Sequence, residues 1–212
     1  MPWVETERRA LVETFRTTSP EAPTLCEGWD TRRLLAHLVQ REHDLPATVG
    51  DVVTQGEPGN ERFLNKLVDG ARTPEGYEAL IGRFAGGPPK WSPFSWAGEN
   101  INLLEYIVHH EDVRRGAGPV EPRSLPAEES RSLWTKLPLI GRVTFRKSPV
   151  GVVLARPTGG SHVIKKGEDA VTLTGDPVEL ALYLNGRREA ARVEVSGAPE
   201  AVARFDSWVS TL

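Results

Sequence analysis

The sequence predicts an α+β protein in which a bundle of about four helices precedes a small domain of strands and helices. In the first half, apolar residues recur at the spacing of amphipathic helices. Residues 116–126 contain three prolines and two glycines, which cannot continue a helix. Beyond residue 151 the apolar period shortens to that of strands. We therefore expect domains at 1–116 and 127–212, joined by a linker at 117–126.

In the first domain, Asp30 is a candidate N-cap for the second helix, with Trp29 placed to contact Leu34. Pro46 is expected to end or kink that helix. Glycine and proline predict a loop over 86–98. Short connections between such helices favour antiparallel neighbours. The expected helices span residues 4–15, 30–45, 61–69, 75–84 and 99–115.

In the second domain, a helix is expected over 127–137, and a final helix over 199–209. Asp176 and Glu179 flank a proline and suggest a capping box for a helix that Gly186 ends. The expected strands span residues 152–156, 162–166, 171–174 and 192–196.

Composition restricts the classes of protein to which the chain can belong. The 212 residues carry 26 Lys+Arg against 29 Asp+Glu, so no basic excess points to a nucleic-acid partner. The longest apolar run is about six residues, far below the ~20 that a membrane-spanning helix needs. The single cysteine excludes an internal disulfide and a cysteine-rich zinc site, and the first residues do not resemble a signal peptide. A cytoplasmic protein that binds neither nucleic acid nor membrane is expected.

The helix at 99–115 carries a stripe of polar side chains that can coordinate a metal or orient a ligand. Glu105 and His109 are four residues apart and so lie almost above one another on a helix. Asn102 and Asp112 extend the stripe, which contains no lysine or arginine. A solvated helix face, or a buried histidine satisfied by an acid, would explain the same pattern.

His37 lies on the flank of the second helix, where a boundary histidine without a special role is the alternative. Together with Glu105 and His109 it offers two imidazoles and a carboxylate from facing helices, as metal sites in helical bundles do. Three protein ligands leave a fourth position open, which is typical of a catalytic zinc. Iron or nickel would accept the same ligands. Glu42 falls inside the apolar arc of the helix and needs a partner there.

Other side chains are weaker candidates. His43 and His110 are expected to be exposed rather than ligating. Cys26 is either a nucleophile or a small buried side chain, and Arg187 could bind an anionic substrate in an interdomain cleft. The loop with Trp91 and Trp96 could contact a second subunit or line that cleft. The candidates for supporting or substrate-binding roles are Arg41, Glu42, Asn102, Asp112 and Arg187.

Three segments together resemble the mycothiol-dependent maleylpyruvate isomerase family, within the wider DinB-like superfamily. The run TLCEGWDTRRLLAHLV, residues 24–39, resembles its second helix, and NLLEYIVHHEDVRR, residues 102–115, resembles its metal-binding helix. The run VTLTGDPVELALYLNGR, residues 171–187, resembles its sterol-carrier-like C-terminal domain. The run at 108–115 also resembles a subgroup known mainly as metal-binding proteins.

The resemblance implies a DinB-like four-helix bundle that holds a divalent metal, with zinc expected, through His37, Glu105 and His109. It implies mycothiol as thiol co-substrate, whose sulfur would bind the open metal position. The expected activity is an isomerase or thiol S-transferase acting on a small electrophile, as a monomer or homodimer; the alternative is a metal-binding protein without turnover. Actinobacteria make mycothiol, and their GC-rich genomes agree with the 20 arginines against 6 lysines.

Overall fold

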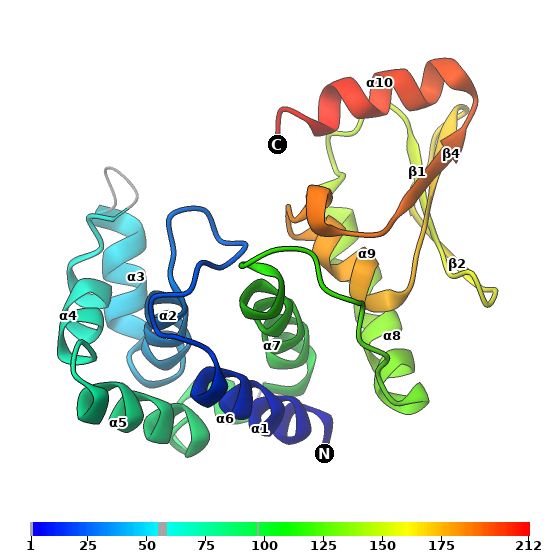
Figure 1. The fold of residues 1–212 in the computed structure, drawn as a ribbon. Helices are drawn as coiled ribbons and strands as arrows, with labels where there is room; N and C mark the ends of the chain where they lie inside the picture. Colours follow the sequence, from blue (N-terminus) through cyan, green and yellow to red (C-terminus); the bar gives the residue numbers. More distant parts are fainter. Residues whose placement is uncertain (1, 55–58, 97) are drawn as a thin grey trace. The chain divides into compact units, whose positions relative to one another are not determined.

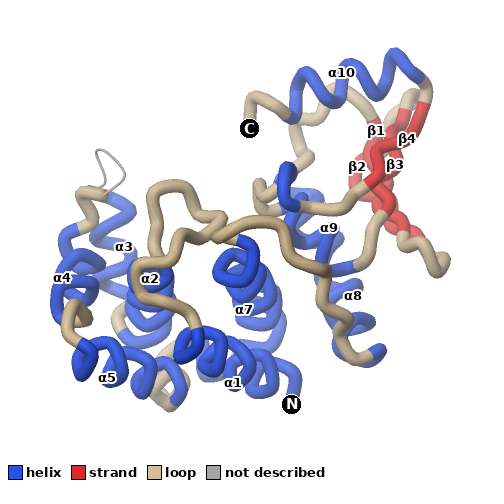
Figure 2. The backbone as a smooth tube through the Cα atoms, in the orientation of Figure 1, coloured by secondary structure: helices blue, strands red, loops and turns tan. Residues whose placement is uncertain are grey.

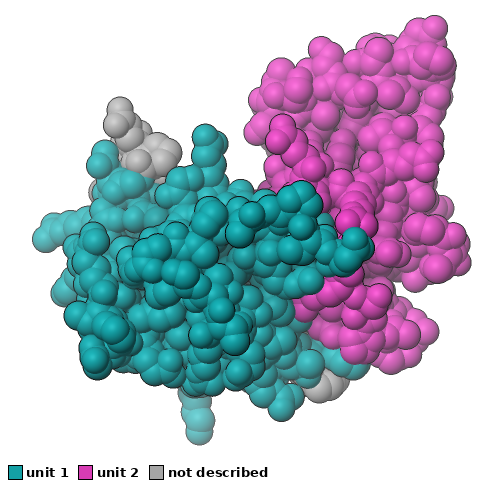
Figure 3. Space-filling model, in the orientation of Figure 1, with its two compact units in different colours: residues 1–121 teal, residues 122–212 magenta. Residues whose placement is uncertain are grey.

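A computed structural model describes residues 2–54, 59–96 and 98–212. The chain forms two compact units, Met1–Glu121 and Pro122–Leu212, coloured separately in Figure 3. The boundary falls inside the segment 117–126. Each unit is described by itself below. Within the described residues, no helix has the length and apolar character that crossing a membrane would require.

The first unit is helical (Figure 1). Helix α1 contacts α7 and α5, and α2 contacts α5, so the four longest helices of this unit form a bundle. The shorter α3 and α4 pack beside α2, while α6 contacts α7. Phe15 and Phe84 meet edge to face in the core, with ring centroids 6.0 Å apart. The helices are α1 (Pro2–Thr17), α2 (Thr31–His43), α3 (Leu45–Thr54), α4 (Arg62–Gly70), α5 (Pro74–Ala85), α6 (Pro93–Trp96) and α7 (Gly98–Arg115).

Capping explains where α2 begins and ends. The predicted N-cap is confirmed, because the Asp30 side chain accepts from the Arg33 amide at 2.7 Å. The helix ends at His43, and α3 follows at once. Asp44 accepts from the Ala47 amide at 3.0 Å, and Pro46 occupies the first turn, where no backbone donor is needed. Helix α3 was not predicted from the sequence, and neither was the short α6 inside the expected loop at 86–98.

The second unit carries a four-stranded sheet with helices around it (Figure 2). The strand order is β2-β1-β3-β4, with β1 parallel to β3 and the other neighbours antiparallel. Helix α8 packs on α9 and β2, and α10 packs on β3 and β4. The predicted α+β class is confirmed. The elements are α8 (Ala127–Thr144), β1 (Gly151–Ala155), β2 (Ser161–Lys165), β3 (Ala170–Thr174), α9 (Pro177–Leu184), a 3₁₀ turn (Arg188–Ala190), β4 (Glu194–Gly197) and α10 (Pro199–Val209).

Two local expectations for this unit are wrong. Helix α8 continues through Pro138 to Thr144 because tertiary packing outweighs the helix-breaking proline: Gly141 lies directly against Ile164. The capping box does not form, since Asp176 makes no side-chain cap. Glu179 instead accepts from the Arg192 amide at 2.7 Å, which ties α9 to the segment before β4.

Gly116 marks a close approach between the end of α7 and the segment before α2. A Cβ atom there would lie 2.0 Å from the Pro23 carbonyl oxygen, so Gly116→Ala is expected to destabilise the protein by about 1–3 kcal/mol through overpacking. Gly82→Ala is the matched control: it lies in α5 with open space around its Cβ, and should stabilise by roughly 0.5–1 kcal/mol. Thermal unfolding should show opposite shifts, and equal shifts would contradict the close approach.

Candidate metal centre

The structure brings the three predicted ligands together. His37 comes from α2, while Glu105 and His109 lie one turn apart on α7. Glu105 Oε1 is 3.5 Å from His37 Nε2 and 3.2 Å from His109 Nε2. Their ligand atoms all lie within 4.8 Å of one another. Both imidazoles therefore present the same nitrogen, Nε2, to one carboxylate oxygen.

The donor set and its spacing fit a divalent transition metal. Zinc binds imidazole nitrogen and carboxylate oxygen at about 2.0–2.1 Å, so tetrahedral ligand atoms stand roughly 3.3 Å apart. The two carboxylate-to-imidazole distances, 3.2 and 3.5 Å, bracket that separation. The Glu105 side chain is 28% exposed, so the group is not sealed from solvent. Two of the three separations within the triad thus suit a tetrahedral metal, and the third lies within 4.8 Å.

Electrostatics distinguish the two histidines. Burial lowers the pKa of His37 and leaves its imidazole neutral. Burial would also lower the pKa of His109, but its hydrogen bonds, led by that to Asp112, raise the pKa well above the usual value. Burial would raise the pKa of Glu105, yet hydrogen bonds from the two imidazoles hold it well below the usual value. The surroundings therefore favour the neutral form of His37 and the charged forms of His109 and Glu105.

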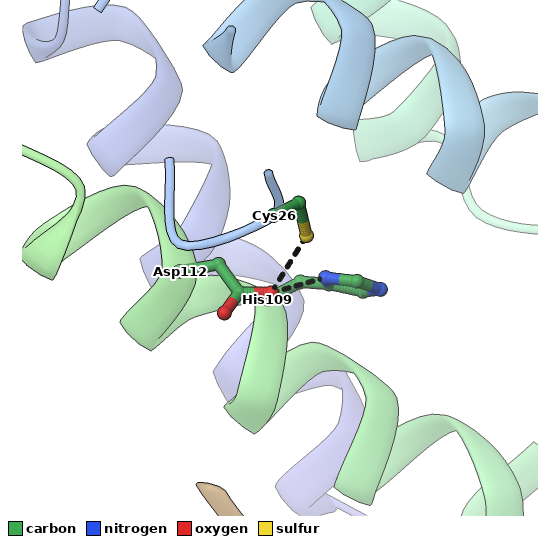
Figure 4. Close-up of side chains that lie close together, drawn as sticks. All are labelled: Cys26, His109 and Asp112. Atoms are coloured by element: carbon green, nitrogen blue, oxygen red, sulfur yellow. Dashed lines mark hydrogen bonds and ion pairs between the residues drawn. The ribbon is translucent and has the colours of Figure 1, made fainter. Parts of the chain in front are cut away.

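Asp112 orients His109 from the far side of the ring. Its Oδ2 lies 2.8 Å from His109 Nδ1 (Figure 4). Because the carboxylate only accepts, Nδ1 donates, and Nε2 faces Glu105. Carboxylates commonly hold metal-ligating histidines in this way. The predicted stripe on α7 thus carries a pair of candidate ligands together with the partner that orients one of them.

Arg41 and Asn102 lie beside Glu105. Arg41 Nε is 3.6 Å from Glu105 Oε1, and its Nη1 donates to Asn102 Oδ1 at 3.0 Å. Its guanidinium lies 4.2 Å from the centroid of the Phe94 ring, whose carbonyl accepts from Asn102 Nδ2 at 3.1 Å. The structure therefore holds one buried cation in a fixed place next to the triad.

The remaining candidates are placed elsewhere. Glu42 is bound to Arg8 and Tyr106 in the bundle core, so the partner that its burial required is Arg8. Arg187 belongs to the second unit, where its Nη1 donates to the Asn185 carbonyl, and its substrate role stays a prediction. Trp91 is 67% exposed, and the role of its loop also stays a prediction.

The expectation that His110 is exposed is wrong. Its ring is buried between α7 and α1. Nδ1 lies 2.8 Å from Glu7 Oε1, and Nε2 lies 2.7 Å from Thr14 Oγ1. His43 is half-buried rather than exposed. Neither histidine belongs to the triad.

Two contacts around the triad were not predicted from the sequence. Cys26 Sγ donates to Asp112 Oδ2 at 3.2 Å, and the Trp29 ring centroid lies 5.3 Å from that of His37. Both residues precede Asp30 in a segment without regular structure, so no periodicity marks them. The available signal was that both residues lie in the run at 24–39, which also contains His37 and carries the family resemblance.

These features define a class of two-unit protein, in which a helical bundle presents two histidines and a carboxylate and a small α+β unit follows. Residues 4–90 match the family model described as the mycothiol maleylpyruvate isomerase N-terminal domain. This match agrees with the resemblance that the motifs suggested. His37 lies inside the matched residues, and Glu105 and His109 lie beyond them.

Solved structures share the fold of nearly the whole chain. The crystal structure of the mycothiol-dependent maleylpyruvate isomerase aligns with a TM-score of 0.59 and 16% identity, covering 92% of this chain and 90% of that one. A crystal structure of a histidine-to-alanine mutant of that isomerase aligns with a TM-score of 0.60, at the same identity and coverage. No curated protein sequence matches the chain.

Proposed function

We propose that this protein is a zinc-dependent isomerase or thiol S-transferase that uses mycothiol and acts on a small electrophile. The observation that carries the proposal is the convergence of His37, Glu105 and His109, with their ligand atoms within 4.8 Å. Nickel or iron would suit the same donors. The family model that residues 4–90 match, described as a mycothiol maleylpyruvate isomerase domain, supports mycothiol as the thiol.

In the proposed mechanism the residues of the triad hold and orient the reacting partners. His37, Glu105 and His109 would bind the metal, and Asp112 fixes the ring of His109. A divalent metal lowers the pKa of a coordinated thiol and so supplies a thiolate nucleophile at neutral pH. Arg41, held by Asn102 and by the Phe94 ring, places a positive charge beside the triad, where it can orient an anionic group of the substrate.

The proposed location of the protein is the cytoplasm of an actinobacterium. Mycothiol is made by actinobacteria, and the arginine-rich composition agrees with such a source. A single cysteine suits a reducing cytoplasm. The proposed reaction has two small molecules as partners, the thiol and the electrophile that it attacks.

Elemental analysis of untagged protein purified without chelators tests the metal. We expect near-stoichiometric zinc. In the cobalt-substituted protein, mycothiol should add a thiolate-to-metal absorption band, whereas S-methylated mycothiol should not. A protein that takes up no metal, or a cobalt spectrum that mycothiol leaves unchanged, would contradict the proposal. Turnover of maleylpyruvate or of a mycothiol conjugate separates an enzyme from a metal-binding protein without turnover.

A further inference from the structure

The segment 24–29, here called the 24–29 loop, is fastened to α7 at Asp112. The Leu25 amide donates to the Asp112 carbonyl at 3.1 Å, and Cys26 Sγ donates to the Asp112 carboxylate at 3.2 Å. The approach of Gly116 to Pro23 brings the two backbones together next to this point. The loop is thus joined to α7 through both the backbone and the side chain of one residue.

Cys26 and His109 share one carboxylate oxygen. Asp112 Oδ2 accepts from Cys26 Sγ and from His109 Nδ1, as the dashed lines in Figure 4 show. The Asp112 side chain is completely buried. The orientation of this carboxylate depends on the groups that donate to it, and the orientation of the imidazole depends on the carboxylate. Hydrogen bonds therefore link the Cys26 thiol to the Asp112 carboxylate and the carboxylate to the His109 imidazole, whose Nε2 faces Glu105.

The other end of the loop contacts the second imidazole. Trp29 lies against His37, with the two ring planes at 59°. Internal hydrogen bonds hold the loop in shape: the Trp29 amide donates to the Cys26 carbonyl at 2.9 Å, and Thr24 donates to the Trp29 carbonyl through its amide and hydroxyl. Gly28 supplies the positive φ, 75°, that the turn requires. One compact loop therefore contacts His37 directly and is linked to His109 through Asp112.

We propose that Cys26 is a positioning residue of the metal centre, acting through Asp112 on His109. The inference rests on the proposed function, because it concerns the same triad. Cys26 acts as a hydrogen-bond donor on the Nδ1 side of the ring, opposite the Nε2 atom that faces Glu105. The rival role is that of a ligand, since Cys26, His109 and Asp112 also have ligand atoms within 4.8 Å of one another.

Zinc affinities measured by chelator competition test this role. Cys26→Ala removes the donor and is expected to weaken zinc binding about tenfold, the lower end of the range for outer-shell partners. Cys26→Ser keeps a donor and should restore affinity to within about threefold of wild type. Asp112→Asn should weaken binding by itself, and adding Cys26→Ala to it should cause no further loss. Cys26→Val gives a second variant without a donor if the alanine variant does not fold.

Each contrary outcome overturns the role. Wild-type affinity in Cys26→Ala, or equal losses in the alanine and serine variants, would show that the donor does not matter. An undiminished effect of Cys26→Ala in the Asp112→Asn protein would show that Cys26 does not act through Asp112. A thiolate-to-cobalt band without added thiol, absent from Cys26→Ser, would make Cys26 a ligand instead. A wild-type protein that binds no metal overturns the proposed function itself, whereas the other outcomes leave that function standing.

Discussion

Replacing His37 with alanine is expected to lower zinc affinity by about 100-fold while the metal-free protein stays folded. Structural zinc sites with four ligands bind with roughly 10–16 kcal/mol, which is about 3 kcal/mol for each ligand. That loss corresponds to about two orders of magnitude in the dissociation constant. Chelator competition measures it directly.

The metal-free protein should tolerate this change because little depends on His37 without a metal. Its side chain is 27% exposed, and its one hydrogen bond in the triad is long, at 3.5 Å. Its lowered pKa means that no charge is lost at neutral pH. His109→Ala is a less clean variant, since it would leave the completely buried Asp112 without its imidazole partner.

His43→Ala is the matched control, because His43 lies on the same helix and outside the triad. Its zinc affinity should equal that of wild type. Glu105→Gln, which keeps the shape of the side chain and removes its charge, should lose affinity as His37→Ala does. Unchanged zinc binding in His37→Ala would contradict the assignment of this residue as a ligand.

The sequence was sufficient to predict the parts of the site that a single helix determines. Glu105, His109 and Asp112 share one face of α7 because their spacing is helical, and the structure places all three together. The position of His37 beside Glu105 and His109 depends instead on how α2 packs near α7. Periodicity within one helix carries no information on its neighbours. The grouping of His37 with Glu105 and His109 was predicted because all three side chains can bind a metal, and because the family resemblance implies the same set.

What the sequence did not predict depends on partners distant in the chain. His110 was assigned to the exposed side of its helix, but α1 covers that side and supplies Glu7 and Thr14 as hydrogen-bond partners. Cys26 reaches Asp112 from a loop 86 residues away in sequence. Helix propensity also gave the wrong end for α8, which continues through Pro138 because tertiary packing outweighs the low helix propensity of proline.

The buried carboxylate of Glu42 leads to the second large expected effect: Arg8→Met should destabilise the protein by about 3–5 kcal/mol, because it leaves a buried charge without its partner. Arg8 is 1% exposed, and its Nη1 donates to Glu42 Oε2 at 2.8 Å and to the Phe84 carbonyl at 2.7 Å. Its Nη2 donates to the Tyr106 hydroxyl, which in turn donates to Glu42 Oε1. The cation thus holds together α1, α2, α5 and α7, the four helices of the bundle.

The expected loss corresponds to a fall of roughly 10 °C in the midpoint of thermal unfolding, at about 2–4 °C per kcal/mol for a chain of this size. Arg9→Met, on the exposed side of the same helix, is the matched control and should change stability by less than about 0.5 kcal/mol. If the unpaired charge causes the loss, then Arg8→Met with Glu42→Leu should be more stable than Arg8→Met alone, because removing both ions also removes the cost of burying one of them. A double variant less stable than Arg8→Met would instead mean that the hydrogen bonds of Glu42 to the bundle, chiefly that from Tyr106, stabilise the fold even without the arginine.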